Sequence, residues 1–187
     1  MFSTTKTRPR YGTREGRVTP KEDTTHTLLL DLPDLLHKMR MNHIDEIHLT
    51  STRISSYEIT SIAEGLNRNS SVQYLFLSHT GIGDSGAAAI ARALGRNQTV
   101  SSVYLIGNNI GDEGAIALAE TLKTNTSLRL LNLSRNSISY NGAVALAEAL
   151  KVNSVVKLIY DGNSFGFDGS TLLSEARNRP YLTYPRF

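Results

Sequence analysis

One pattern of 28 residues occurs five times in succession along this chain. The copies begin at Ile44, Val72, Val100, Leu128 and Val155, and a single deletion just before the last copy shortens its spacing. A fixed period of this length is typical of a solenoid, in which each unit buries its apolar face against its neighbours. The repeat therefore constrains the fold more than any other feature of the sequence.

Each copy has two halves with different hydrophobic periods. The first half alternates, as in residues 100–105 (VSSVYL), which predicts a short strand with its fourth and sixth positions buried. The second half, which starts at Gly114 in the third copy, places apolar residues at helical spacing and polar residues opposite them. We therefore expect each copy to form a strand, a turn, a helix and a second turn.

This order of elements predicts an α/β solenoid. Each strand reaches the next through a helix, so the strands are expected to pair in parallel and to share one face of the stack. Helices are wider than strands, and the stack should therefore bend into a horseshoe. The strands then line the concave face and the helices cover the convex face.

The ends of the chain differ from the repeats. Residues 1–27 are rich in Thr, Arg, Gly and Pro and contain few aliphatic side chains, which predicts a basic flexible tail. Residues 28–187 are expected to form one repeat domain, with residues 177–187 as its C-terminal cap.

An N-terminal capping helix is predicted over residues 28–43. Leu32, Leu36 and Met39 recur there at helical spacing, and Pro33 suits a first helical turn. A solenoid needs such a cap because its terminal repeat would otherwise expose its core.

Acidic and amide side chains recur at the two ends of the predicted helices. Asp84 and Asp112 are placed to N-cap the helices that begin beside them. An asparagine recurs where each helix ends, and we expect it to adopt the left-handed conformation common at that position. These asparagines are Asn69, Asn97, Asn125 and Asn153. Three of them also begin N-x-S/T sequons, which the repeat itself explains.

The repeat resembles leucine-rich repeats of the long helical type found in ribonuclease inhibitor and in intracellular innate-immune receptors. The resemblance covers residues 44–176 and includes the GxxALAExLKxN helices. The paired strand positions that carry it are Leu75/Leu77, Val103/Leu105 and Leu131/Leu133. The turn positions that carry it are Asn108, Asn136, Asn163, Ile82, Ile110, Ile138 and Phe165.

The resemblance implies a protein without enzymatic activity that binds other proteins on its concave face. Three positions depart from the family pattern. Thr52 and Thr80 stand where asparagine is usual, and Tyr160 replaces a leucine. The first and last repeats are therefore expected to be less regular than the middle ones.

Strand alternation assigns a second set of side chains to the concave face. If positions four and six of each repeat are buried, positions three, five and seven point outward. The apolar members of this set are expected to form one contiguous patch for a protein partner, because aromatic side chains are common interface anchors. They are Tyr74, Phe76, Tyr104, Ile106, Leu130 and Ile159. Alternatively, a terminal segment covers the patch, or a register one residue different buries these side chains.

The tail supplies a second candidate site. Residues 1–27 hold six cations and three acids, whereas the remaining 160 residues hold fourteen charges of each sign. This excess favours contact with an acidic protein or with RNA. The six cations are Lys6, Arg8, Arg10, Arg14, Arg17 and Lys21. A solvated tail without a partner is the alternative, and a mitochondrial transit peptide is another.

Motifs that suggest catalysis are explained by the repeat. Residues 81–86 match G-x-G-x-x-G, and residues 83–86 match the GDSG segment of serine proteases. The next copy, however, reads NIGDEG at the same place, so it keeps two of the glycines and lacks both the first glycine and the serine. The chain contains no cysteine, and its five histidines do not cluster, so no metal, cofactor or enzymatic activity is expected.

Two functions remain open from the sequence. The first is a non-enzymatic scaffold that binds a protein through the concave face. The second is a structural subunit of a large intracellular assembly, such as a ribosome or a ciliary axoneme, anchored by the basic tail. The absence of cysteine, of a long apolar run and of a signal peptide favours an intracellular location, cytoplasmic or cytoskeletal, and no membrane contact.

Overall fold

The computed structural model describes residues 31–177 of the chain. Within this range the elements alternate between helix and strand. The helices are α1 (Leu32–Arg40), α2 (Ser56–Leu66), α3 (Gly83–Leu94), α4 (Asp112–Leu122), α5 (Tyr140–Val152) and α6 (Gly166–Arg177). The strands are β1 (Glu46–His48), β2 (Tyr74–Phe76), β3 (Ser102–Tyr104), β4 (Leu130–Asn132) and β5 (Lys157–Ile159).

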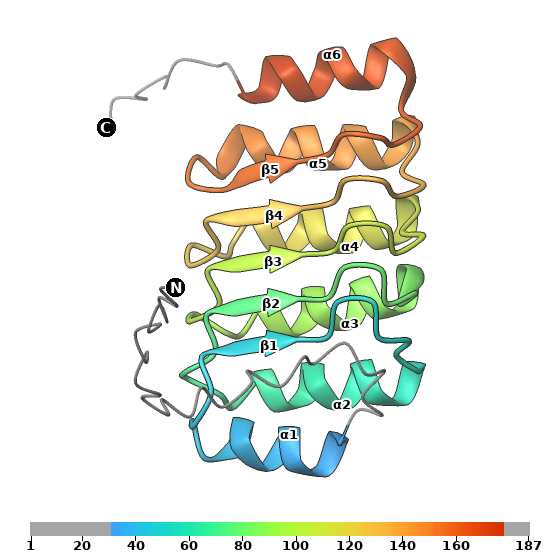
Figure 1. Cartoon of the computed structure of the whole chain (residues 1–187). Helices are drawn as coiled ribbons and strands as arrows, with labels where there is room; N and C mark the ends of the chain where they lie inside the picture. Colours follow the sequence, from blue (N-terminus) through green and yellow to red (C-terminus); the bar gives the residue numbers. More distant parts are fainter. Residues whose placement is uncertain (1–30, 178–187) are drawn as a thin grey trace, which may run out of the picture.

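The strands form one parallel sheet in chain order, and the helices stack behind it in the same order (Figure 1). Every strand pairs with its neighbour at the same repeat position, as Glu46 does with Tyr74 and Leu130 does with Lys157. The last pair has this register in spite of the one-residue deletion, which therefore falls in the preceding turn. The prediction of an α/β solenoid is confirmed.

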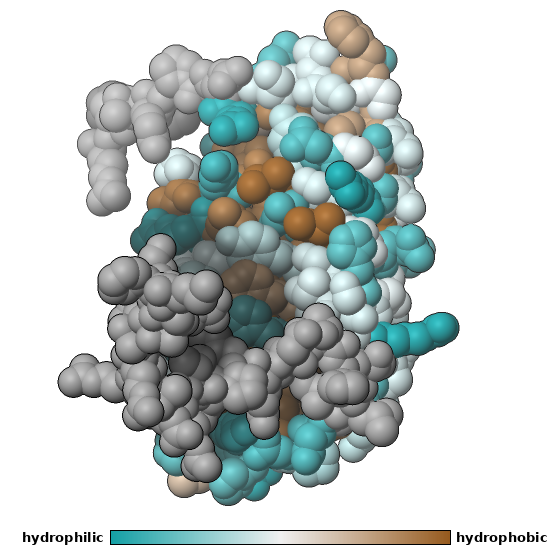
Figure 2. Space-filling model, in the orientation of Figure 1, coloured by the Kyte–Doolittle hydropathy of each residue, from teal (hydrophilic) through white to brown (hydrophobic). Residues whose placement is uncertain are grey.

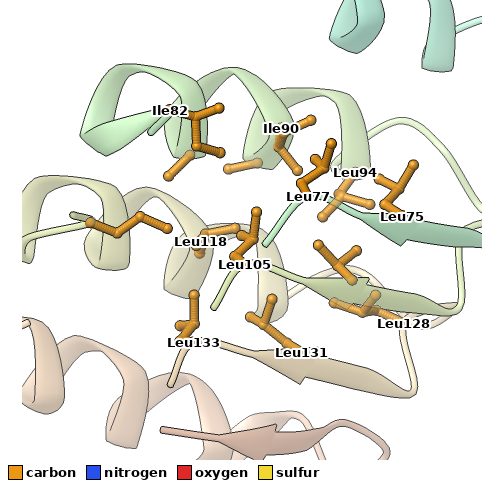
Figure 3. Close-up of a cluster of buried hydrophobic side chains, with 14 of the residues drawn as sticks. Leu75, Leu77, Ile82, Ile90, Leu94, Leu105, Leu118, Leu128, Leu131 and Leu133 are labelled. Carbon is orange, nitrogen blue, oxygen red and sulfur yellow. The ribbon is translucent and has the colours of Figure 1, made fainter. Parts of the chain in front are cut away.

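A continuous apolar core fills the space between the sheet and the helices. Leu75 and Leu105 point into it from the strand side, and Ile90, Leu94 and Leu118 meet them from the helices (Figure 3). All five are at most 1% exposed. Burial of such a side chain contributes roughly 1.5–3 kcal/mol, so each repeat is stabilised mainly by contact with the repeats on either side.

Glycine near the start of α4 and of α5 allows each helix to approach the preceding one closely. A Cβ atom on Gly114 would lie 2.7 Å from Asp84 Oδ1 and 3.0 Å from the Cβ atom of Ala87 on α3. Gly142 meets the equivalent atoms of Asp112 and Ala115 on α4. These glycines, which contribute to the G-x-G-x-x-G-like spacing, are thus explained by packing between repeats.

The asparagines at the helix ends form a buried ladder. None of them has a positive φ, so the expectation of a left-handed conformation is wrong. Instead, Asn97 Nδ2 donates to the carbonyls of Leu66 and Asn69 in the preceding repeat, both at 2.9 Å. Its Oδ1 accepts from the backbone N–H groups of Thr99 and Val100. Each such side chain thus satisfies the end of one helix and the start of the next strand.

The hydroxyl groups two residues further on join the same ladder. Thr99 Oγ1 donates to the carbonyl of Val72, and Ser127 Oγ donates to that of Val100. The sequon-like spacing therefore reflects two side chains that both bond to the preceding repeat. Asn125, at 2% exposure, is buried.

The prediction that Asp84 and Asp112 cap their own helices is wrong, because each of them caps the helix of the next repeat. Asp84 lies in the first turn of α3, but its Oδ1 accepts from the N–H groups of Gly111 and Gly114 at 2.7 and 2.9 Å, at the start of α4. Asp112 in α4 likewise accepts from Ser139 and Gly142 at the start of α5. Position along the chain suggested a local cap, whereas the stacking of repeats brings the next helix within reach.

Burial and hydrogen bonding act in opposite directions on the pKa of Asp112. Burial raises it, but hydrogen bonds from the Ser139 hydroxyl, the Ser139 N–H and the Gly142 N–H outweigh that effect, so the net pKa is below the ordinary value. The carboxylate is therefore held in its charged form at a helix N-terminus, where the helix dipole also favours it.

Left-handed residues recur in the turns after the strands. Their φ angles lie between 55° and 73° at one equivalent position in all five repeats: Ser51, His79, Gly107, Arg135 and Gly162. Beside them, Asn108 Nδ2 donates to the Leu77 carbonyl, and its Oδ1 accepts from the Thr80 N–H. Thr80, a departure from the family pattern, is buried and also donates its hydroxyl to Asn108, so this turn stays regular.

Helix α1 covers the first repeat. Asp31 accepts from the N–H of Asp34 as its N-cap, and a proline occupies the first turn as the sequence predicts. Met39 is fully buried and lies against Gly65 of α2, where a Cβ atom would approach its Cε to 2.9 Å. The described helix is shorter than the predicted range of 28–43. The tail boundary and most of the predicted C-terminal cap lie outside the described residues.

Candidate protein-binding surface

The outward side chains of the strands form rows across the sheet. Because the strands pair in register, repeat position three gives one row from Glu46 to Lys157, and position five gives another from His48 to Ile159. In each strand the residue between them is buried, as Leu75 is. The alternation predicted from the sequence is therefore present, and both rows lie on the concave face.

Three rings of the position-five row stack on one another. His48 and Phe76 have ring centroids 4.3 Å apart and planes inclined by 15°, and Phe76 and Tyr104 have centroids 4.9 Å apart at 11°. These separations match the roughly 4.8 Å spacing of paired strands, so the sheet itself sets the stack. We call His48, Phe76 and Tyr104 the aromatic row.

Tyr74 lies beside the aromatic row on the same strand as Phe76. Their ring centroids are 6.4 Å apart, and both side chains are half-buried. At the edge of the sheet, His48 Nε2 lies 2.5 Å from Glu46 Oε2, and both side chains are exposed. The site predicted from the sequence included only the apolar members of the outward rows, so it left out His48. The alignment of the repeats, which puts His48 level with Phe76, is the signal that could have done so.

The other apolar residues form a second, aliphatic half on β4 and β5. Leu130 and Ile159 are half-buried there. Ser102 lies between Tyr74 and Leu130 in the position-three row, and Asn132 lies between Tyr104 and Ile159 in the position-five row. Figure 2 shows this side with hydrophobic residues among polar ones at the level of β4 and β5. The surface thus has an aromatic half and an aliphatic half, with Ile106 half-buried after β3.

The stacked rings have two properties that favour contact with a protein surface. Stacked rings held by a sheet lose little conformational freedom when a partner covers them, which reduces the cost of association. Tyrosine also offers a hydroxyl beside its apolar ring, a combination enriched at protein interfaces. Among residues 31–177, no group of three or more metal-ligating side chains lies together.

The other sites suggested by the sequence are either outside the described residues or have a structural role. The six cations of the tail lie outside the described residues. In the GDSG segment, Asp84 is occupied as the cap of α4, and Ser85 is exposed on α3. None of the helices in the described range combines the length and apolarity of a membrane-spanning segment.

The repeats match a known family of sequences. The profile of the family described as Leucine Rich repeat matches residues 68–91, 96–119 and 124–147. These ranges fall within the stacked strand–helix units of the solenoid. Three leucine-rich repeats of this family therefore lie between residues 68 and 147. A search of curated proteins finds no match.

Solved structures share the whole architecture. Actin-binding site 2 of leiomodin-1 matches with a TM-score of 0.64 at 23% identity, over 78% of this chain and 89% of that chain. The C-terminal domain of tropomodulin from Caenorhabditis elegans matches with a TM-score of 0.63 at 17% identity, over 80% of this chain and 92% of that chain. At these identities the likeness shows a common fold.

Proposed function

We propose that this chain is a non-enzymatic scaffold that binds a partner protein through the concave face of its sheet. The observation that carries the proposal is the aromatic row, which presents three stacked rings across three repeats. Tyr74 extends this surface sideways, and the aliphatic half extends it toward β5. Together they offer apolar anchors surrounded by polar side chains, the usual anatomy of a protein interface.

Actin is the first purified partner to test. The part of leiomodin-1 that shares this fold is an actin-binding site. A role on actin also fits the intracellular, cytoskeletal location expected from the sequence. The cations of the basic tail would add contact with an acidic surface of the same partner, because they attract carboxylates over about one Debye length. A stable place in a larger assembly remains the alternative function.

The test uses Tyr104→Ala and Tyr74→Ala in the full chain. Each truncation is expected to weaken partner binding by about 1–3 kcal/mol, as loss of a buried aromatic anchor does, without loss of the fold. Tyr140→Ala is the matched control, because Tyr140 is 48% exposed at the start of α5, away from the strands. Binding to actin is measured by co-sedimentation with filaments and by calorimetry with monomers.

Partners labelled by proximity in cells are compared across the same variants, so the test does not depend on actin. The proposal is supported if the protein captured by the wild type is lost by Tyr104→Ala and kept by Tyr140→Ala. Equal retention by all three proteins would refute the assignment of this face. Fractionation of cell extracts addresses the alternative, since an assembly subunit would sediment with a large particle in every variant.

A further inference from the structure

A groove crosses the helical face of the first repeats, on the side of the solenoid opposite the aromatic row. It consists of two hollows of about 560 and 510 Å³ and a smaller one of about 80 Å³. Glu64 and Asn67 line all three, and Arg96 lines both of the larger ones. The hollows therefore join into one depression that runs from α1 over α2 to α3.

Small residues make this depression. Gly65 lines it beside Leu36 of α1, and Ala89 and Ala93 of α3 line it next to Ala63 of α2. Gly65 is half-buried and Gly95, which lines the second hollow, is exposed, whereas the three alanines are buried beneath the depression. The helix backbone therefore lies close to the surface at the two glycines, where an extended segment of another chain can approach it.

Four arginines border the groove, and we call it the arginine groove. Arg40 ends α1, Arg68 follows α2, and Arg92 and Arg96 lie at the end of α3. All four are exposed, and none takes part in an ion pair within residues 31–177. Glu64 is the single acid on the lining, so the groove carries a clear positive excess.

Unlike these arginines, the lysines on the helices each form an ion pair with an acidic residue. Lys38 bonds to Asp34, Lys123 bonds to Glu120, and Lys151 lies beside Glu148, each on its own helix. Within residues 31–177, the lysines on the helices are therefore neutralised locally, whereas the four arginines of this groove are not. This contrast singles out the groove from the rest of the helical surface.

Stabilisation of helix ends does not account for the cluster. A cation near a helix C-terminus interacts favourably with the helix dipole, which could explain one arginine per helix. However, α3 carries two, and the positions equivalent to Arg68 and Arg96 in the next repeats are Thr124 and Val152. Those later helices end instead on Lys123 and Lys151, one position earlier, and each lysine is paired with a glutamate of its own helix, so a cation at a helix end does not have to be an unpaired arginine.

We propose that the arginine groove docks an extended, acidic segment of a partner protein. Guanidinium groups bind carboxylates with two parallel hydrogen bonds, which favours arginine over lysine for this task. Neighbouring helix axes lie about 8–10 Å apart, close to the roughly 9 Å between side chains three residues apart on one face of an extended polyproline II segment. A hollow with a floor of small residues accepts a peptide backbone, whereas a flat membrane surface would touch only the rims.

The test measures binding of a fluorescein-labelled peptide of eight glutamates to the full chain by fluorescence anisotropy. Arg68→Glu combined with Arg96→Glu is expected to weaken binding about tenfold or more, because attraction is replaced by repulsion at two contacts. Arg53→Glu combined with Arg129→Glu makes the same change in net charge at exposed positions outside the groove. The basic tail is present in every protein, so the difference between the two pairs reports on the groove.

The proposal predicts that the loss of affinity depends on the position of the substituted arginines and on the ligand. The groove pair should lose affinity at least fivefold more than the control pair, and the peptide should shift the side-chain Nε–Hε resonances of Arg68 and Arg96 in NMR spectra. Arg68→Gln with Arg96→Gln should give an intermediate loss, and circular dichroism should show the same helicity for all proteins. Equal loss in the two charge-reversed pairs, or tighter binding of a poly-uridine RNA than of the peptide, would overturn the proposal.

Discussion

Replacement of Asn97 by alanine tests whether the buried asparagine ladder joins the repeats. Asn97 is 3% exposed and forms hydrogen bonds of 2.8–2.9 Å with four backbone groups. Alanine would leave two carbonyls and two N–H groups without these partners. An unsatisfied buried polar group costs about 1–3 kcal/mol, and water can reach some of the four, so we expect a loss of roughly 3–5 kcal/mol in the free energy of unfolding.

Asn97→Asp separates the two roles of this side chain. A carboxylate keeps the acceptor for Thr99 and Val100, but it loses both donors and faces the carbonyl oxygens of Leu66 and Asn69. We therefore expect it to be at least as destabilising as alanine at neutral pH.

The measurement is urea unfolding followed by circular dichroism, with Asn141→Ala as the control. Asn141 is exposed in the first turn of α5, and its loss should change stability by less than about 0.5 kcal/mol. If Asn97→Ala and Asn141→Ala unfold at the same urea concentration with the same slope, the ladder does not stabilise the stack as argued here.

Two further substitutions test contacts between repeats. Gly114→Ala should destabilise the fold by about 1–3 kcal/mol, because its Cβ atom would lie 2.7 Å from Asp84 Oδ1. Gly95→Ala is the control, since its Cβ atom would meet only ordinary contacts of 3.5 Å or more. In thermal melts the control should be as stable as the wild type or more stable. Asp112→Asn should cost about 1 kcal/mol at pH 7. The pKa of Asp112 is lowered in the folded state, so its contribution is complete above the unfolded pKa of about 4 and is lost as the pH falls below it. Unfolding measured from pH 7 to pH 2 should therefore show a shallower acid loss in Asp112→Asn than in the wild type, and parallel curves would contradict the assignment.

The repeat period made most of the fold predictable. Alternation in each copy fixed which strand residues are buried, and the alignment of copies then fixed the register even across the deletion before β5. The outward rows followed directly, which is why Tyr74, Phe76 and Tyr104 could be placed on one face from the sequence. Their binding role remains a proposal.

Contacts between repeats were harder to predict, because their hydrogen bonds join residues 25 to 31 positions apart. The sequence shows Asp84 beside its own helix, and only the stacking distance shows that it reaches Gly111 and Gly114. The arginine groove was missed although Arg40, Arg68 and Arg96 lie 28 residues apart at one repeat position, each four residues before the start of a copy. Comparison of the positions at the helix ends would have found three of its four arginines, whereas Arg92 lies at another position.

The aspartate caps also bear on how such proteins can be shortened, lengthened or recombined. Asp84 belongs to one repeat by sequence but completes the helix of the next, as Asp112 does again for α5. A unit cut at the sequence period would thus separate a helix from its cap, whereas a cut that keeps each aspartate with the following helix would preserve it. The series stops at Tyr140, which has no carboxylate to offer α6. Genetic exchange or design that grafts extra units onto this chain should therefore insert them before α5, where both halves of the cap are present.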